Sequence, residues 1–239
     1  MDKAMITEIN KETFWQLIRE MKMECGQDMD ASVEWMKQHL LQMPPEQSLR
    51  FHTLVHGYED AANQYGLWSV ASLIKEYGCS DDGFIDFRAW LIAQGKEIYM
   101  AALADPDSLS EVPRYGDCTF EIFSYVGDYA YEEQTGRSAY DDCTEAMRKN
   151  TLAEVSQEIR YHPMIKYPLD IPDTAFVYPK IGAQFIEKYG TLRFSSGWQD
   201  SPFPEERRLY EEGKREVRKL RQEAQKSKGK PKKREGQSR

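Results

Sequence analysis

Apolar side chains recur every three or four residues along most of the chain, which is the spacing of amphipathic helices. The clearest case lies between residues 78 and 96, where Phe84, Phe87 and Leu91 fall on one face of a predicted helix. Burying each such side chain stabilises a fold by roughly 1.5 to 3 kcal/mol. The pattern therefore predicts that this helix packs its aromatic face into a core.

The residues before this helix carry the signals of a turn between two helices. Gly78 follows the amphipathic run at 67–77 and suits the left-handed conformation that ends many helices. Ser80, Asp81 or Asp82 can cap the next helix by accepting backbone N–H groups, and a cap of this kind stabilises by ~1 kcal/mol. The two carboxylates also favour the positive end of the helix dipole. We therefore expect a helix-turn-helix corner here.

A second face of the same predicted helix has mixed chemistry. Asp82, Asp86, Trp90 and Ala93 share it at helical spacing, so carboxylates stand beside one large aromatic ring. Such a face is either a solvated rim or a contact surface. It is the first candidate for a binding site.

Helical periodicity extends over much of the remaining sequence. Asn10 or Thr13 is the expected cap of the first helix, and Asp117 that of the helix ended by Gly136. In the last core helix, Ile186 is expected to face inward together with its apolar neighbours at positions 181 and 185. The predicted helices lie at 10–23, 30–43, 45–65, 67–77, 95–104, 118–134, 151–161 and 178–189, the helix at 95–104 either continuing the central one or restarting after Gly95.

Two segments break the helical pattern. Four prolines at positions 163, 168, 172 and 179 predict an extended segment that wraps over the core, because proline lacks the N–H that regular structure needs. Residues 191–198 are compatible with a short strand or an irregular arm.

Length and composition indicate one substantial core. The chain has 239 residues, of which 40% are hydrophobic and 12% aromatic. The expected fold class is mainly α: a single multi-helical globular domain over residues 1–203, then a charged exposed helix at 204–226 and a disordered basic tail at 227–239. No apolar run approaches the ~18 residues of a membrane span, and no secretion pattern opens the chain. We therefore expect a cytoplasmic protein with no membrane contact.

Charge separates the tail from the body. Residues 213–239 hold twelve Lys or Arg and three Glu, a net charge of +9, whereas the other 212 residues have an excess of 17 negative charges. The tail could attract phosphate groups of nucleic acid with an affinity that falls as salt rises. It could equally lie on its own acidic body.

The titratable residues give weak signals for metal or redox chemistry. The four cysteines are far apart with no CxxC pair, which is typical of reduced structural thiols. His52 and His56 lie four residues apart, with Glu59 a turn later, but the chain lacks the second-position Glu of an HExxH motif and an identifiable third ligand. We expect no metal site and no cofactor.

Arg88 and the nearby carboxylates have competing interpretations. Arg88 is expected to be buried beside the turn and paired with a carboxylate, the alternative being a bound anion. Asp81, Asp82 and Asp86 are expected to cap the helix and complement its dipole, although three carboxylates could hold a divalent cation. Trp90 is expected in the core rather than at a ligand.

The central segment GCSDDGFIDFRAWLIAQGK, residues 78–96, resembles a bacterial family catalogued as domain of unknown function 4240. The resemblance includes the pair Leu67 and Trp68 and the stretch ALADPDSL at 102–109, and it covers about residues 13–189. It implies a bacterial, mainly helical domain. It implies no reaction, because the family has no established activity to transfer.

The sequence therefore favours a non-enzymatic protein-interaction or regulatory module with an unidentified protein partner. It has neither the GxSxG motif of a nucleophilic serine nor a phosphate-binding glycine loop. One alternative is an enzyme of unknown class with an Asp/Arg/Trp pocket around residues 80–96, and another is weak nucleic-acid contact through the tail. No catalytic residue is assigned, and the candidate binding residues are Ser80, Asp81, Asp82, Asp86, Arg88 and Trp90.

Overall fold

A computed structural model describes residues 6–75, 78–190 and 197–228 of the chain. Over these residues the fold contains helices and no strand, which confirms the mainly α class. The helices are α1 (Lys11–Cys25), α2 (Met29–Leu41), α3 (Pro45–Ala61), α4 (Tyr65–Ile74), α5 (Asp81–Ala93), α6 (Lys96–Ala104), η1 (Pro106–Glu111), η2 (Gly116–Cys118), η3 (Glu121–Tyr125), α7 (Val126–Thr135), α8 (Ala139–Asp142), α9 (Glu145–Ser156), α10 (Ile171–Val177), α11 (Pro179–Tyr189), η4 (Trp198–Asp200) and α12 (Pro204–Lys228), where η denotes a 3-10 helix.

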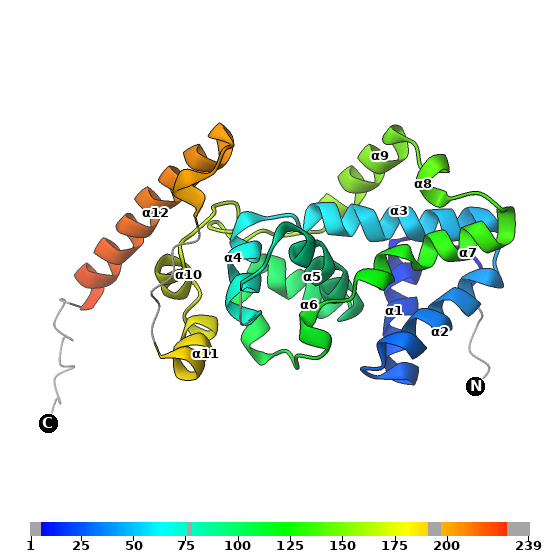
Figure 1. Cartoon of the computed structure of the whole chain (residues 1–239), viewed down its shortest axis with the longest axis horizontal. Helices are drawn as coiled ribbons and strands as arrows, with labels where there is room; N and C mark the ends of the chain where they lie inside the picture. The colour runs from blue at the N-terminus through cyan, green and yellow to red at the C-terminus, as the bar shows by residue number, and fades with distance from the viewer. Residues whose placement is uncertain (1–5, 76–77, 191–196, 229–239) are drawn as a thin grey trace, which may run out of the picture.

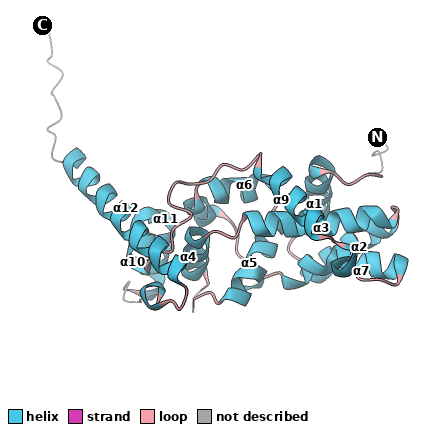
Figure 2. Cartoon of the chain, turned by 90° about the horizontal axis from the view of Figure 1, so that it is seen from above, coloured by secondary structure: helices cyan, strands magenta, loops and turns pink. Residues whose placement is uncertain are grey.

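The helices follow one another along an elongated molecule. In Figure 1, α1, α2, α3 and α7–α9 form one end, α4–α6 the middle and α10–α12 the other end. The view from above in Figure 2 keeps the same order. The helix α3 packs against α7, α9 and α5, so it connects the first end to the middle.

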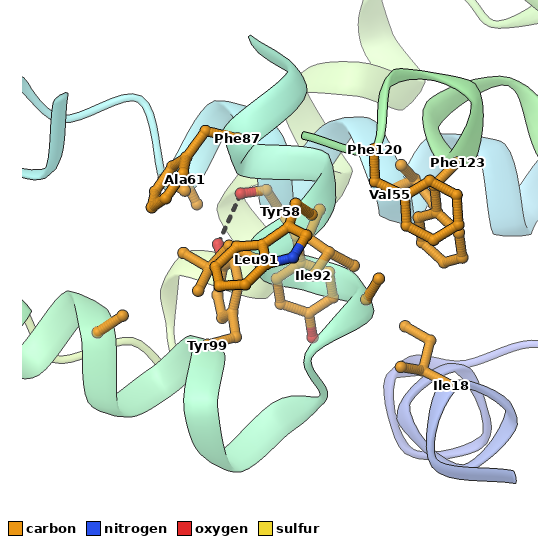
Figure 3. Packing of buried hydrophobic residues seen from close by; sticks show 14 of the residues in the cluster. Ile18, Val55, Tyr58, Ala61, Phe87, Leu91, Ile92, Tyr99, Phe120 and Phe123 are labelled. Atoms are coloured by element: carbon orange, nitrogen blue, oxygen red, sulfur yellow. Dashed lines mark hydrogen bonds between the residues drawn. The ribbon is translucent and has the colours of Figure 1, made fainter. Parts of the chain in front are cut away.

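One hydrophobic cluster runs through most of the molecule, from α1 to α11. Figure 3 shows its centre, where Tyr58 of α3 and Tyr99 of α6 lie beside the apolar side chains of α5. The hydroxyl of Tyr99 donates to the carbonyl of Tyr58 at 2.6 Å. The Tyr58 hydroxyl accepts from Trp15 Nε1 at 2.9 Å and donates to Glu158 at 2.6 Å. These bonds satisfy the polar ends of large aromatic side chains that would otherwise be costly to bury.

Local signals explain where several helices begin and end. Asn10, one of the two predicted caps, is the N-cap of α1 and forms a capping box with Thr13. Gly136 adopts a left-handed conformation with φ of 72° and ends α7, also as predicted. A close crossing of α3 and α7 requires glycine, because a Cβ at Gly127 would lie 2.7 Å from the backbone N of His52.

Two helix predictions were wrong because tertiary contacts override the apolar periodicity. The helix expected at 45–65 ends at Ala61, and α4 begins at Tyr65. The N–H of Gly66 donates to the carbonyl of Ile165 at 2.6 Å, which ties this break to the proline-containing segment. The helix expected at 118–134 begins only at Val126, and Asp117 does not cap it.

Other boundaries differ in smaller ways. Asp117 and Cys118 both have positive φ, so a turn and short 3-10 helices replace the predicted first turns. The helix predicted at 151–161 begins earlier, at Glu145 after the cap Thr144, and ends at Ser156. A restart after Gly95, which has a φ of 97°, confirms one of the two alternatives for 95–104.

The proline-containing region is partly helical. It forms irregular chain up to Asp170 and then the short helix α10, followed by α11. The expected inward position of Ile186 on α11 is wrong, since this side chain is 43% exposed. Of the predicted arm at 191–198, residues 191–196 lie outside the described part of the chain.

The last helix, α12, packs on the body from its start to Arg221, whose guanidinium lies 2.8 Å from Asp173 of α10. Tyr210 and Val217 are buried, and Val217 joins a second apolar cluster with Tyr167 and Leu169. The Tyr210 hydroxyl donates to Asp170 Oδ2 at 2.6 Å. The predicted charged helix thus exists and continues to Lys228, while residues 229–239 of the predicted tail lie outside the described residues. Across the described ranges, none of the helices combines the length and apolar character needed to cross a membrane.

Candidate binding pocket

A pocket of about 730 Å³ lies where the start of α5 meets α4, α11 and the base of α12. Trp68 of α4, Trp198 of η4 and Phe203 give it an aromatic wall, and Asp81 and Glu206 add carboxylates. Its volume falls within the range of about 300 to 1,000 Å³ that is usual for ligand sites. The pocket therefore brings the predicted corner together with a part of the chain more than a hundred residues away.

The aromatic wall has a defined geometry. The Trp68 ring stacks on Phe84 with centroids 5.1 Å apart and an interplanar angle of 8°. Trp198 stands nearly perpendicular to Trp68, at 5.3 Å and 85°, and to Tyr65, at 5.4 Å and 83°. Trp68 Nε1 also donates to the carbonyl of Cys79 at 2.7 Å, which joins α4 to the corner.

The corner forms at the predicted place, with one of the three predicted caps in use, but Gly78 does not end the preceding helix: α4 ends at Ile74 with Lys75 as its C-cap, before the expected end at 77. Gly78 has a φ of 89°, and Ser80 is the N-cap of α5, its Oγ accepting from the N–H of Gly83 at 3.1 Å. Asp81 and Asp82 occupy the first helical turn and are exposed. Of these two carboxylates, only Asp81 lines the pocket.

A hydroxyl network holds the opposite wall in place. Glu206 accepts from Ser201 Oγ at 2.5 Å and from the Tyr65 hydroxyl at 3.1 Å. Burial, together with the charge of Glu206, raises the pKa of Tyr65 to about 12. Arg207 donates to the carbonyl of Ser201. These bonds connect the base of α12 to α4 across the pocket.

Cys79 is the pocket residue with the greatest intrinsic nucleophilic potential. Burial raises the pKa of its thiol to about 11, and the nearby Lys75 opposes this shift only in part. At neutral pH the side chain is therefore a neutral thiol, which is a poor nucleophile.

The predicted site residues Asp86, Arg88 and Trp90 do not line the pocket. Asp86 is half-buried, and its backbone carbonyl accepts from the N–H of Phe120, which places it against η3. Its pKa is raised, first by burial and then by the charge of Glu121. It does not line the pocket.

Arg88 is buried as expected, but the expected pairing with a carboxylate is not found among the described residues, where it donates to backbone carbonyls instead. Its Nη1 donates to the backbone carbonyl of Glu59 at 3.0 Å and its Nε to the carbonyl of Phe84 at 3.3 Å. The guanidinium carbon lies 5.1 Å from the centre of the Phe84 ring. Burial lowers the pKa of Arg88, while the charges of Glu59 and Asp60 oppose the shift. The residue joins α3 to α5 inside the fold.

Trp90 lies in the core with 1% of its surface exposed, and its ring contacts those of Phe87 and Tyr115. Within the described part of the chain, its indole N–H finds no hydrogen-bond partner. The predicted second face of α5 is therefore not one surface, because the second half of this helix is packed on all sides. Of the six candidate residues, Ser80, Asp81 and Asp82 lie together at the corner, and the others do not join them.

Sequence reasoning missed Trp198, Phe203 and Glu206. These residues follow the core helices in a short irregular stretch, where periodicity says nothing about which side chains meet. One signal was available: two large aromatic residues in a polar, proline-containing segment have no apolar neighbours of their own to pack against.

The two histidines of α3 form a separate buried polar cluster. His56 Nδ1 lies 2.8 Å from Glu59 Oε2, and Ser124 donates to the other carboxylate oxygen. His52 is 1% exposed, and burial, followed by the charge of His56, lowers its pKa to about 3. Among the described residues, no group of three or more His, Cys, Asp or Glu side chains is arranged to hold a metal ion.

Fold and pocket together define an all-helical domain with an open aromatic pocket at one corner. The chain belongs to the family described as "Protein of unknown function (DUF4240)", whose model matches residues 9–133, more than half of its length. The match includes Trp68 and Asp81 but ends within α7, before the region that supplies Trp198 and Glu206. No curated protein and no solved structure matches the chain.

Proposed function

We propose that this protein is a non-enzymatic protein-interaction module with a regulatory role, and that the pocket is its recognition site. The observation that carries the proposal is the aromatic wall beside the acidic corner. Phe203 leaves 63% of its surface exposed at this wall. Exposed aromatic side chains at a concave site are typical of surfaces that bind a partner, because they gain much free energy when they are covered.

The chemistry of the pocket favours binding over catalysis. Its thiol is neutral at ordinary pH, and Glu206 is engaged by two hydroxyl groups. Among the described lining residues there is no histidine that could serve as a general base. The described lining residues therefore do not supply a nucleophile together with a histidine base beside it.

The test is affinity capture from a cell extract with two matched proteins. One carries Trp198→Ala with Phe203→Ala in the pocket, and the other carries Ile122→Ala with Tyr129→Ala, two exposed apolar side chains outside it. We expect partners recovered by the wild type to be retained by the second variant and lost by the first. Recovery of the same proteins by both variants would contradict the proposal. Circular dichroism checks that both variants fold.

A second candidate function is weak contact with nucleic acid through α12. The observation that favours it is the row of exposed basic residues in the second half of this helix, including Arg218, Lys219 and Lys226. Phosphate binding of this kind weakens steeply as salt rises. Fluorescence anisotropy of a labelled single strand should therefore show binding at low salt that is lost at high salt and reduced by Arg218→Gln. Salt-independent binding would argue against it.

A further inference from the structure

Among the described residues that line the pocket, both charged side chains are acidic. Asp81 and Glu206 contribute carboxylates, and the described lining residues include no lysine or arginine. Asp82, exposed on the same helical turn as Asp81, adds a further negative charge beside the opening. Lys75, near Cys79, and Arg207, which donates to the carbonyl of Ser201, are not among the described lining residues. An anionic group entering the pocket would therefore meet these carboxylates directly, and like charges that face each other disfavour association.

The aromatic side chains of the pocket offer ring surfaces that a cation could contact. Phe84 covers one face of the Trp68 ring, and Trp198 stands almost perpendicular to Trp68. A positive charge within about 6 Å of an indole face is attracted by the ring quadrupole. Two indoles at right angles, together with carboxylates, therefore favour a cation attached to an apolar body.

We propose that the pocket binds a basic segment of a partner protein, and that a lysine side chain of this segment enters between Trp198 and the carboxylates while a neighbouring apolar residue covers Phe203. This inference rests on the proposed function. The partner is a polypeptide because the pocket opens at exposed residues, Asp81 and Phe203, beside which a chain can continue over the acidic corner. The protein's own residues 221–239 are basic but contain no large apolar side chain to fill the aromatic wall.

Three capped tripeptides test the charge directly. They share two phenylalanines and differ at the centre, which is lysine, norleucine or glutamate; norleucine keeps the four-carbon chain of lysine and lacks its charge. Binding is followed at low salt through the indole N–H resonances of the isotopically labelled full chain. Trp68→Phe and Trp198→Phe assign the two resonances of the pocket.

We expect the lysine peptide to shift these two resonances and to bind about threefold or more tightly than the norleucine peptide, with the glutamate peptide weakest. Asp81→Asn should reduce the preference for lysine. Asp82→Asn is the matched control, because it removes the same charge from the neighbouring residue, whose side chain does not line the pocket. It should reduce the preference less.

The outcomes separate this inference from the proposed function. Norleucine or glutamate peptides that bind as tightly as the lysine peptide would overturn the cationic preference and leave the pocket as a recognition site. Equal effects of Asp81→Asn and Asp82→Asn would show that Asp81 does not contact the lysine side chain directly. If no peptide shifts either indole while partner capture still depends on Trp198, the inference falls and the proposed function stands. Failure of both experiments overturns both.

Discussion

The helices α5 and α12 show two ways in which this chain makes a helix. In α5, eight of thirteen residues are buried, among them Phe87, Trp90 and Leu91. In α12, which has 25 residues, Tyr210 and Val217 are the large side chains that are fully covered within the described part. Both helices begin at the pocket. The wall formed by the start of α5 is therefore supported by the core, whereas the wall formed by the start of α12 belongs to a helix with few buried side chains.

The difference between the two helices has a physical origin. The second half of α5 is held by the apolar surface that it buries, so its neighbours stabilise it more than its own residues do. Most residues of α12 are Glu, Lys, Arg and Gln, which have favourable helix propensity, and its charge pairs, such as Arg208 with Glu205 and Glu212, lie on the exposed surface. Substitutions should therefore act on the whole fold in α5 and locally in α12.

The largest expected effect is that of Trp90→Ala. Removing a ring that is 1% exposed should lower the free energy of unfolding by about 3 to 5 kcal/mol, because it removes buried area and leaves a cavity. Urea denaturation measures the change. Ile85→Ala is the control on the same helix, where the side chain is 42% exposed, and it should cost below about 1 kcal/mol. Similar losses in the two variants would remove the contrast within α5.

The second expected effect concerns pH and His52 on α3, which packs against α5. Its folded-state pKa of about 3 lies below the ordinary 6.5, because burial and His56 disfavour the imidazolium, with Asp128 opposing them. The unfolded state therefore binds the proton more readily, and stability falls as pH drops below about 6.5. The loss is about 2 kcal/mol at pH 5.

Denaturation of wild type and His52→Gln between pH 7 and pH 5 measures this effect. The variant should be less stable at pH 7 but show a flatter profile. Ser48→Ala is the control, since it alters a buried residue of the same helix that does not titrate, and its profile should stay parallel to that of the wild type. Parallel profiles for His52→Gln as well would show that His52 does not cause the loss.

Val217→Ala tests whether α12 is an independent element. The change removes part of the small cluster with Tyr167 and Leu169 and should weaken the docking of α12 by about 1 kcal/mol. Limited proteolysis should then cleave α12 faster while the main melting transition stays unchanged. Leu220→Ala, at a side chain that is 38% exposed, is the control with little expected effect. A drop in the main transition would mean that α12 is part of the cooperative core.

The smallest effect is expected for Arg208→Ala. Arg208 pairs with Glu205 and Glu212 on the exposed surface, and such pairs contribute little because water screens them. Alanine also has a higher helix propensity than arginine. Circular dichroism should show unchanged helix content and melting. A clear loss of helix would indicate that charge pairs, rather than propensity and the two buried anchors, hold α12 together.

The local parts of the structure could be predicted from the chain with good success. The N-cap of α5, which falls on Ser80 among the three predicted candidates, the positive φ of Gly78 and the aromatic face of α5 depend on residues within a few positions of one another, and they are confirmed. The predicted end of the preceding helix at 77 is wrong, because α4 ends at Ile74. The split at Ala61 could not be predicted in the same way, because it depends on a hydrogen bond between Gly66 and Ile165.

The sequence by itself determined the helical class, the corner and the separation of charge between body and C-terminal region, since propensity, capping and net charge are local properties. Tertiary structure alone decided which of the candidate residues share a site. The burial of Arg88 and Trp90 was expected from the sequence, but packing against α3 and η3 around the second half of α5 separated these two residues from the corner. The tertiary structure also brought Trp198 and Glu206 next to Asp81. Proximity of this kind depends on how the helices pack, and periodicity along one helix carries no information about it.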